Sequence, residues 1–237
     1  MLRNWTTIRA LTVAVALIVA TAAHTTAQEQ TGPRLKCATE IFDFGFVPQD
    51  ATVSHTYWLR NTGTETVEIK QIKPNCGCTR VPPVDSTIAP GDSLPVEIIF
   101  ATRNITGKVE KFTRIVSNAE GRSPALTFRS VVFKELENPA PIRSTPAIVN
   151  LNGGTTARVT IRNVSRDQLI AKVVDSPPEH IRLEVSELTL APEESKEISF
   201  EIIPQENDHE FNKSITLETN DSAKTRITIP ITNIKKE

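Results

Sequence analysis

The sequence predicts an all-β fold, with two tandem immunoglobulin-like β-sandwiches that follow an N-terminal signal peptide. Three observations support this prediction: an internal repeat, a composition suited to strands, and short apolar stretches separated by turn residues. Aromatic residues make up 5% of the 237 residues, with nine Gly and one Met, and Thr, Val and Ile are abundant. Because β-branched side chains pack well on pleated surfaces, strands are favoured over helices.

The first 27 residues have the pattern of a secretory signal peptide. Arg3 and Arg9 give a positive start without any acid, and an apolar run follows over residues 10–23. Small residues then allow cleavage after Ala23 or after Ala27. The run is short for a bilayer span, which needs about 20 residues, so an uncleaved anchor is the less favoured alternative. We therefore expect the signal peptide to be removed at one of these two sites and the mature chain to be extracytoplasmic (periplasmic, cell-surface or secreted), without spanning a membrane.

The same landmarks occur twice, at a constant offset of 102 residues. The three pairs are Leu59-Arg60-Asn61 and Ile161-Arg162-Asn163, Ile88-Ala89-Pro90 and Leu190-Ala191-Pro192, and Ser117-Asn118 and Thr219-Asn220. Equal spacing indicates two copies of one domain, and about 100 residues suffice to bury a core in each copy. We assign the two immunoglobulin-like domains to residues 36–134 and 140–237.

Each copy carries apolar residues with the period of two that is typical of strands. Residues 53–60 predict a strand whose buried face carries Val53, His55, Tyr57 and Leu59, and whose other face carries Ser54, Thr56, Trp58 and Arg60. Further strands of the first copy are predicted around Val67, Ile69 and Ile72; Leu94, Val96, Ile98 and Phe100; Phe112 and Ile115; and Leu126, Phe128 and Val131. Those of the second copy are predicted around Ala157, Val159 and Ile161; Leu169, Ala171 and Val173; Ile198, Phe200 and Ile202; Ile215 and Leu217; and Ile227, Ile229 and Ile231. Several short strands separated by turn residues in about 100 residues are typical of an immunoglobulin-like sandwich.

Charge and motifs argue against several classes of protein. Residues 34–137 carry a net charge of +1 and residues 138–237 a net charge of −3, so neither copy has the basic field that nucleic acid requires. Neither a nucleophile elbow nor a metalloprotease helix motif occurs, and we expect no catalytic residues, no cofactor and no metal site. His55 is the nearest candidate for a metal ligand, but its place in the alternation is typical of a half-buried strand histidine.

Cys76 and Cys78, which occur only in the first copy, are the candidates for chemistry. Two cysteines with a single residue between them have Cα atoms near the upper end of the distance that a disulfide bridges, so a bond would close a small, strained ring. Gly77 lacks a Cβ and is best able to accept the backbone angles of such a ring. Strain would make the bond easy to reduce. The alternatives are a purely structural brace, a bond from Cys37 to one of the pair, free thiols, or a soft metal ion such as Cu(I). Cys37 is otherwise the candidate for an unpaired cysteine.

The first copy resembles a bacterial domain of unknown function, family 1573, which is similar to Hydin-type immunoglobulin-like domains. The residues that carry the resemblance are Asp43-Phe44-Gly45, residues 53–63, Asn75-Cys76-Gly77-Cys78-Thr79, and Ile88 with Pro90-Gly91. The resemblance covers about residues 36–134 and implies a sandwich in an exported protein, with no function assigned.

Two classes of function remain. We expect an exported, non-enzymatic protein that acts as an interaction or structural module, with another exported or cell-surface protein as its partner. The alternative is a thiol redox or copper-handling protein that uses Cys76 and Cys78. The sequence defines neither the partner nor the oligomeric state.

Overall fold

The computed structural model describes residues 31–134, 138–177, 179–203 and 211–233. Over these residues the chain forms eighteen strands and no helix, so the all-β prediction is confirmed. The signal peptide predicted over residues 1–27 lies outside the described residues.

The first sandwich packs a four-stranded sheet against one half of a larger sheet. The small sheet has the order β1 (Leu35–Cys37), β3 (Thr52–Asn61), β7 (Ser93–Ala101) and β5 (Thr79–Arg80). The facing strands run in the order β2 (Ile41–Pro48), β9 (Ala125–Phe133), β8 (Gly107–Ser117), β4 (Val67–Pro74) and β6 (Thr87–Ile88). Tyr57 of β3 joins the two layers, because its hydroxyl donates to the carbonyl of Thr127 in β9 at 2.6 Å.

The second sandwich repeats this plan. Its small sheet has the order β10 (Ile142–Thr145), β12 (Thr156–Asn163), β16 (Ser195–Ile202) and β14 (Ile181–Leu183). The facing strands run in the order β15 (Glu187–Leu190), β13 (Leu169–Asp175), β17 (Asn212–Thr219) and β18 (Arg226–Thr232), with β11 (Val149–Asn150) beside β18. Cys76 and Cys78 lie between β4 and β5, and the equivalent strands of the second copy are β13 and β14.

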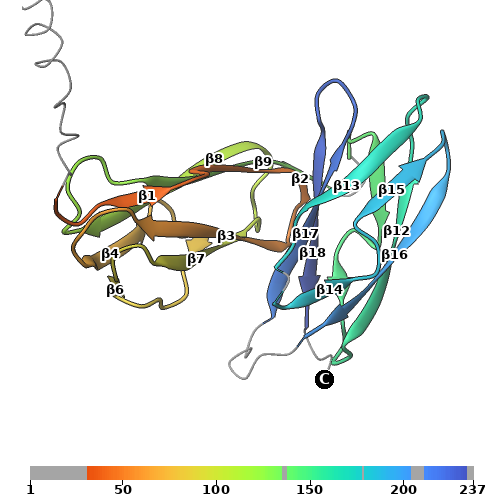
Figure 1. The fold of residues 1–237 in the computed structure, drawn as a ribbon. Coiled ribbons are helices and arrows are strands. Elements are labelled where there is room, and N and C mark those ends of the chain that lie inside the picture. Colours follow the sequence, from red (N-terminus) through yellow and green to blue (C-terminus); the bar gives the residue numbers. More distant parts are fainter. Residues whose placement is uncertain (1–30, 135–137, 178, 204–210, 234–237) are drawn as a thin grey trace, which may run out of the picture. The chain divides into compact units, whose positions relative to one another are not determined.

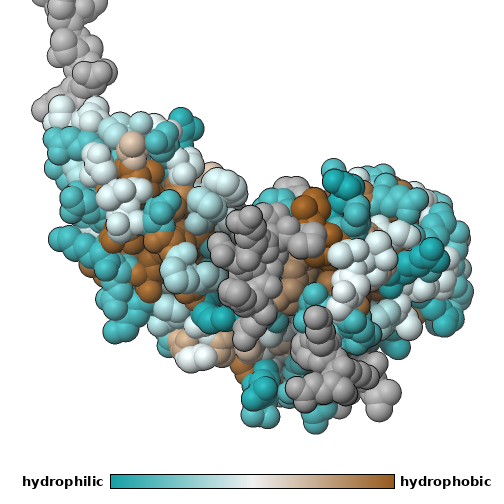
Figure 2. Space-filling view, turned by 90° about the horizontal axis from the view of Figure 1, so that it is seen from below, coloured by the Kyte–Doolittle hydropathy of each residue, from teal (hydrophilic) through white to brown (hydrophobic). Residues whose placement is uncertain are grey.

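Each sandwich has a hydrophobic core of its own. The predicted inward residues Tyr57, Leu59, Ile98 and Phe100 are buried, and Trp58 is 60% exposed, as the alternation predicts. Figure 2 shows that apolar residues nevertheless reach the surface on one face of the first sandwich, bordered by polar residues.

In two strands of the first sandwich, one predicted inward residue lies on the other face. In β8 the buried positions are Val109, Thr113 and the predicted Ile115, and Phe112 lies on the opposite face, beneath the guanidinium of Arg114. In β9 the predicted Leu126 and Phe128 are buried, but Val132 is buried in place of Val131, which is only half-buried. Phe112 and Ile115 are three positions apart in the sequence, as are Phe128 and Val131. Because strand faces alternate with a period of two, neither pair can share one face.

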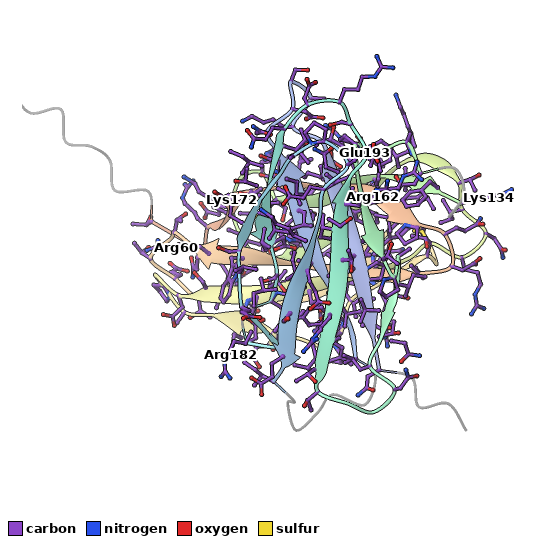
Figure 3. All side chains as sticks on the ribbon, turned by 90° about the vertical axis from the view of Figure 1, so that its right-hand side faces the viewer. Arg60, Lys134, Arg162, Lys172, Arg182 and Glu193 are labelled. Atoms are coloured by element: carbon purple, nitrogen blue, oxygen red, sulfur yellow. A yellow bond between two sulfur atoms is a disulfide. The ribbon has the colours of Figure 1, made fainter. Side chains whose placement is uncertain are left out.

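The repeat is visible as two equivalent buried asparagines. The amide of Asn61 donates to the carbonyls of Glu65 and Ile88, at 2.8 and 2.9 Å. The amide of Asn163 donates to the carbonyls of Asp167 and Leu190, at 2.7 and 3.1 Å, which are the same positions 102 residues later. The preceding residues, Arg60 and Arg162, are exposed, and Arg162 pairs with Glu193 (Figure 3).

The two sandwiches share one sheet, because β18 of the second pairs in parallel with β2 of the first through Ile227 and Phe46 (Figure 1). The hydroxyl of Thr228 donates to the carbonyl of Phe44 at 2.6 Å. The hydroxyl of Ser214 donates to the carbonyl of Ser54 at 2.9 Å. Ser54, expected on the outer face of its strand, is therefore buried beneath β17.

The junction requires glycine at one position. Gly45 has a φ of 64°, and a Cβ at this position would lie 2.1 Å from the carbonyl oxygen of Arg226. The register of β2 against β9 shifts at the same place, between Asp43 and Phe46. A bulge of this kind redirects a strand, and here it brings the β2 backbone against β18.

Candidate functional site at the disulfide

The segment that holds Cys76 and Cys78 is a short turn between β4 and β5. Asn75 fixes its start, since its backbone N–H donates to the carbonyl of Phe112 at 3.1 Å and its side-chain oxygen accepts from the N–H of Phe112 at 3.3 Å. At the other end, the carbonyl of Cys78 accepts from the N–H of Ala101 at 2.9 Å, and Thr79 pairs with Phe100 of β7. Both ends of the turn are therefore tied to strands of the first sandwich.

Cys76 and Cys78 form a disulfide, and their Cα atoms lie 5.3 Å apart. This separation is in the middle of the usual range for disulfides, not at its upper end as the sequence analysis supposed. The difference arises because the backbone turns at Gly77 and Cys78 and does not continue in an extended conformation.

Gly77 does not have the role in backbone geometry that the sequence suggested. Its φ lies outside the left-handed region, and a Cβ built on it would meet no atom within 4 Å. A side chain is therefore compatible with the turn. What the glycine provides is an open approach to the disulfide, because Gly77 is exposed while both cysteines are half-buried.

Thr79 places a hydroxyl beside the two sulfurs. Its Oγ1 lies 3.2 Å from Sγ of Cys76 and 3.9 Å from Sγ of Cys78. A disulfide sulfur carries no hydrogen, so the hydroxyl is the donor in the shorter contact. Thr79 is buried, and its position is fixed by its pairing with Phe100 of β7.

The disulfide borders a pocket of 590 Å³ between the two sandwiches. The first sandwich contributes Thr52, Gly77, Cys78, Thr79, Arg80, Ile99 and Ala101, and the second contributes Phe211, Asn212 and Asn233. Among the described residues, Cys78 rather than Cys76 lines the pocket. The sequence could not indicate the contribution of the second copy, since no motif marks these three residues.

Cys37, the predicted unpaired cysteine, is a free thiol in the structure. Burial raises the pKa of its thiol, which makes it a weaker nucleophile at neutral pH. Cys37 pairs with Leu59, near one end of β3. Thr79, beside the disulfide, pairs with Phe100 of β7, and Phe100 pairs with Val53, near the other end of β3. Six residues along β3 correspond to roughly 20 Å, so Cys37 lies far from the disulfide.

His55 lies in a different contact between the sandwiches. Its Nδ1 is 3.0 Å from a carboxylate oxygen of Asp175, and its ring stacks on Phe42 with centroids 3.7 Å apart. Within the described part of the chain, no group of three or more His, Cys, Asp or Glu side chains is arranged to hold a metal ion. In the same part of the chain, no helix is long and apolar enough to cross a membrane.

The fold and this site define the class: an immunoglobulin-like β-sandwich protein with a disulfide turn in its first copy. Residues 35–132 match the model of the family described as a protein of unknown function (DUF1573), which confirms the resemblance of the first copy. Among curated proteins, none matches this chain in sequence.

Several solved structures are similar in outline. A protein of unknown function from Porphyromonas gingivalis W83 is 13% identical, with 85% of this chain and 99% of that chain covered and a TM-score of 0.37. The ASH/PapD-like domain 7 of human CEP192 is 13% identical, with 48% and 96% covered and a TM-score of 0.36. The Pseudomonas aeruginosa CupB2 chaperone is 12% identical, with 82% and 98% covered and a TM-score of 0.30.

Proposed function

We propose that this protein is an exported, non-enzymatic interaction module whose partner is another exported or cell-surface protein. The observation that carries the proposal is Trp58, which is 60% exposed on the outer face of β3. Tryptophan is enriched among the residues at the centres of protein interfaces that contribute most to binding.

The surroundings of Trp58 support the same proposal. It borders a crevice of 140 Å³ to which the first sandwich contributes Ser54, His55 and Thr56, and the second contributes Asp175, Ser176, Pro177 and Glu179. A concave site beside a large aromatic side chain suits a protein segment that carries an apolar anchor.

The test compares two exposed apolar residues. Trp58→Ser is expected to abolish co-purification of a partner from the extracytoplasmic fraction of the native host. Val116→Ser is the matched control, because Val116 is 46% exposed but lies on β8. If both variants retain every co-purifying protein, or both lose it, Trp58 is not the interaction site.

A second function, thiol redox exchange, is favoured by one specific observation: the Cys76–Cys78 disulfide lines a pocket and has an exposed glycine between its sulfurs. A disulfide that serves only as a brace has no need of either feature. Copper handling would require the reduced form, since the thiolate is the metal ligand.

A further inference from the structure

We propose that the pocket beside the disulfide receives a cysteine of a partner protein, and that this cysteine attacks Sγ of Cys78. The inference rests on the second function proposed above and deepens it. The substrate class is a protein dithiol, and the reaction is a stoichiometric transfer of two electrons from that dithiol to the Cys76–Cys78 disulfide.

The choice of sulfur follows from the pocket and from Thr79. Cys78 lines the pocket and Cys76 is not among the described residues that do, so a thiolate that enters there approaches Cys78 rather than Cys76. The Thr79 hydroxyl lies 3.2 Å from Sγ of Cys76 and 3.9 Å from Sγ of Cys78. A hydroxyl that donates to Cys76 favours the form in which Cys76 carries the negative charge. Cys76 is therefore the leaving group and Cys78 the site of attack.

The transfer consists of two successive thiol–disulfide exchanges. The partner's first thiolate forms a bond to Sγ of Cys78, the Cys76–Cys78 bond breaks, and its electron pair remains on Sγ of Cys76. The partner's second thiolate then attacks its own first sulfur and releases Cys78 as a thiolate. The two protons lost by the partner thiols are taken up by Cys76 and Cys78, directly or through water, and the partner leaves with a disulfide.

The pocket indicates a protein substrate in preference to a small thiol. Its volume of 590 Å³ far exceeds what a single sulfur needs. Its walls combine Phe211, which is buried, with the polar side chains of Asn212 and Asn233. Apolar surface with amide groups at its edge suits an extended peptide, whose backbone offers donors and acceptors at regular intervals.

The first test identifies the attacked sulfur. The oxidised mature chain is mixed with a cysteine-containing peptide, quenched in acid within seconds, and mapped by mass spectrometry. The peptide is expected on Cys78 in roughly tenfold excess over Cys76, the effect of one hydrogen bond to a charged leaving group. Equal labelling, or labelling mainly of Cys76, would overturn the proposal.

Thr79 variants test the role of the hydroxyl. Thr79→Val is expected to slow exchange with the peptide by roughly tenfold, and Thr79→Ser is expected to restore it. If Thr79 had only a structural role, its replacement would not slow exchange selectively. A serine variant as slow as the valine variant would argue against donation to Cys76.

Gly77 variants separate this proposal from the redox function as a whole. Gly77→Gln fits the turn, since a Cβ there meets nothing within 4 Å, and it adds a long side chain at a residue that lines the pocket. We expect the rate with the peptide to fall roughly tenfold while the rate with 2-mercaptoethanol changes by less than about threefold. If both rates stay the same, the pocket does not receive the peptide. If neither thiol opens the bond in the parent chain, the redox function itself is wrong.

Discussion

Asn61 and Asn163 show how a single buried side chain maintains the same turn in both sandwiches. In each copy the amide donates to a carbonyl four residues later and to a carbonyl at the end of a distant short strand. In each copy the side-chain oxygen accepts from the backbone N–H two residues later, Gly63 or Ser165, at 2.9 Å. Buried polar groups in such turns must be satisfied, and asparagine supplies both donors and an acceptor from one side chain.

Asn61→Ala is expected to lower the free energy of unfolding by about 2 to 4 kcal/mol, since two carbonyls and the N–H groups of Gly63 and Arg34 lose their partner inside the protein. Urea denaturation measures the loss. Asn118→Ala is the control: Asn118 also bridges to the backbone, at Thr66 and Glu68, but is exposed, so we expect less than about 1 kcal/mol. Equal losses would show that burial is not what makes Asn61 important.

Phe100 tests the assignment of strand faces. It is fully buried and its ring lies 4.7 Å from that of Phe128, between the two layers of the first sandwich. Phe100→Ala should cost about 3 to 5 kcal/mol through lost packing and the cavity left behind. Trp58→Ala should cost less than about 1 kcal/mol, because the ring is largely in solvent. Thermal and urea denaturation of the two variants would show equal, mild effects only if the faces were assigned wrongly.

At the scale of single elements, the sequence was informative wherever apolar residues alternated without interruption. The inward residues predicted around Tyr57 and Val96 are buried, apart from the half-buried His55, and those predicted around Ile229 are buried in a strand that is covered on both faces. The prediction was wrong at Phe112 and Val131, where an apolar residue lies on each face of the strand. Hydrophobicity alone cannot say which of the two faces meets the core, since Thr113 rather than Phe112 is buried there.

The disulfide turn should add little to the stability of the first sandwich. A bond between residues two apart removes little chain entropy from the unfolded state, so Cys76→Ser combined with Cys78→Ser should change the free energy of unfolding by less than about 2 kcal/mol. Urea denaturation of the double variant measures this change. A larger loss would identify the disulfide as a structural brace and would weaken the redox proposal.

The bulge in β2 is predicted to control the junction between the sandwiches. Gly45→Ala places a Cβ against the carbonyl of Arg226 at a position with positive φ, so we expect a loss of at least about 2 kcal/mol and faster amide exchange in β18. Gly77→Ala is the matched control, because its Cβ meets open space and its φ is ordinary. Protected β18 amides in the Gly45 variant would mean that β2 can shift without releasing β18.

At the scale of the whole molecule, the repeat was readable from the sequence but the junction was not. The second core consists of residues from β10 to β18 and their connections, with Phe46 as a partly buried neighbour from the first copy. Two of the hydrogen bonds that join the copies use Ser54, Ser214 and Thr228, hydroxyl residues that are common on exposed faces. Only the folded structure shows that these hydroxyl residues are buried and that the second copy contributes residues to the disulfide pocket.

Two separate cores within one shared sheet lead to a prediction about folding. Residues 138–237, expressed alone, should give a β-type circular dichroism spectrum and a cooperative thermal transition, because the second core draws almost all its members from this segment. The fragment should melt below the full chain. It lacks Phe46 beside Ile227, and Lys213 no longer pairs with Glu97, a contact of 2.7 Å in the full chain.

Each kcal/mol lost at the junction should lower the melting temperature of the fragment by roughly 4 to 8 °C. Lys213→Ala measures part of this effect: it should destabilise the full chain, where Lys213 is buried against Glu97, more than the fragment, where the same lysine faces water. A fragment with a disordered spectrum would contradict the division into domains 36–134 and 140–237. A fragment as stable as the full chain, with equal effects of Lys213→Ala in both, would show that the shared sheet adds nothing to the stability of the second sandwich.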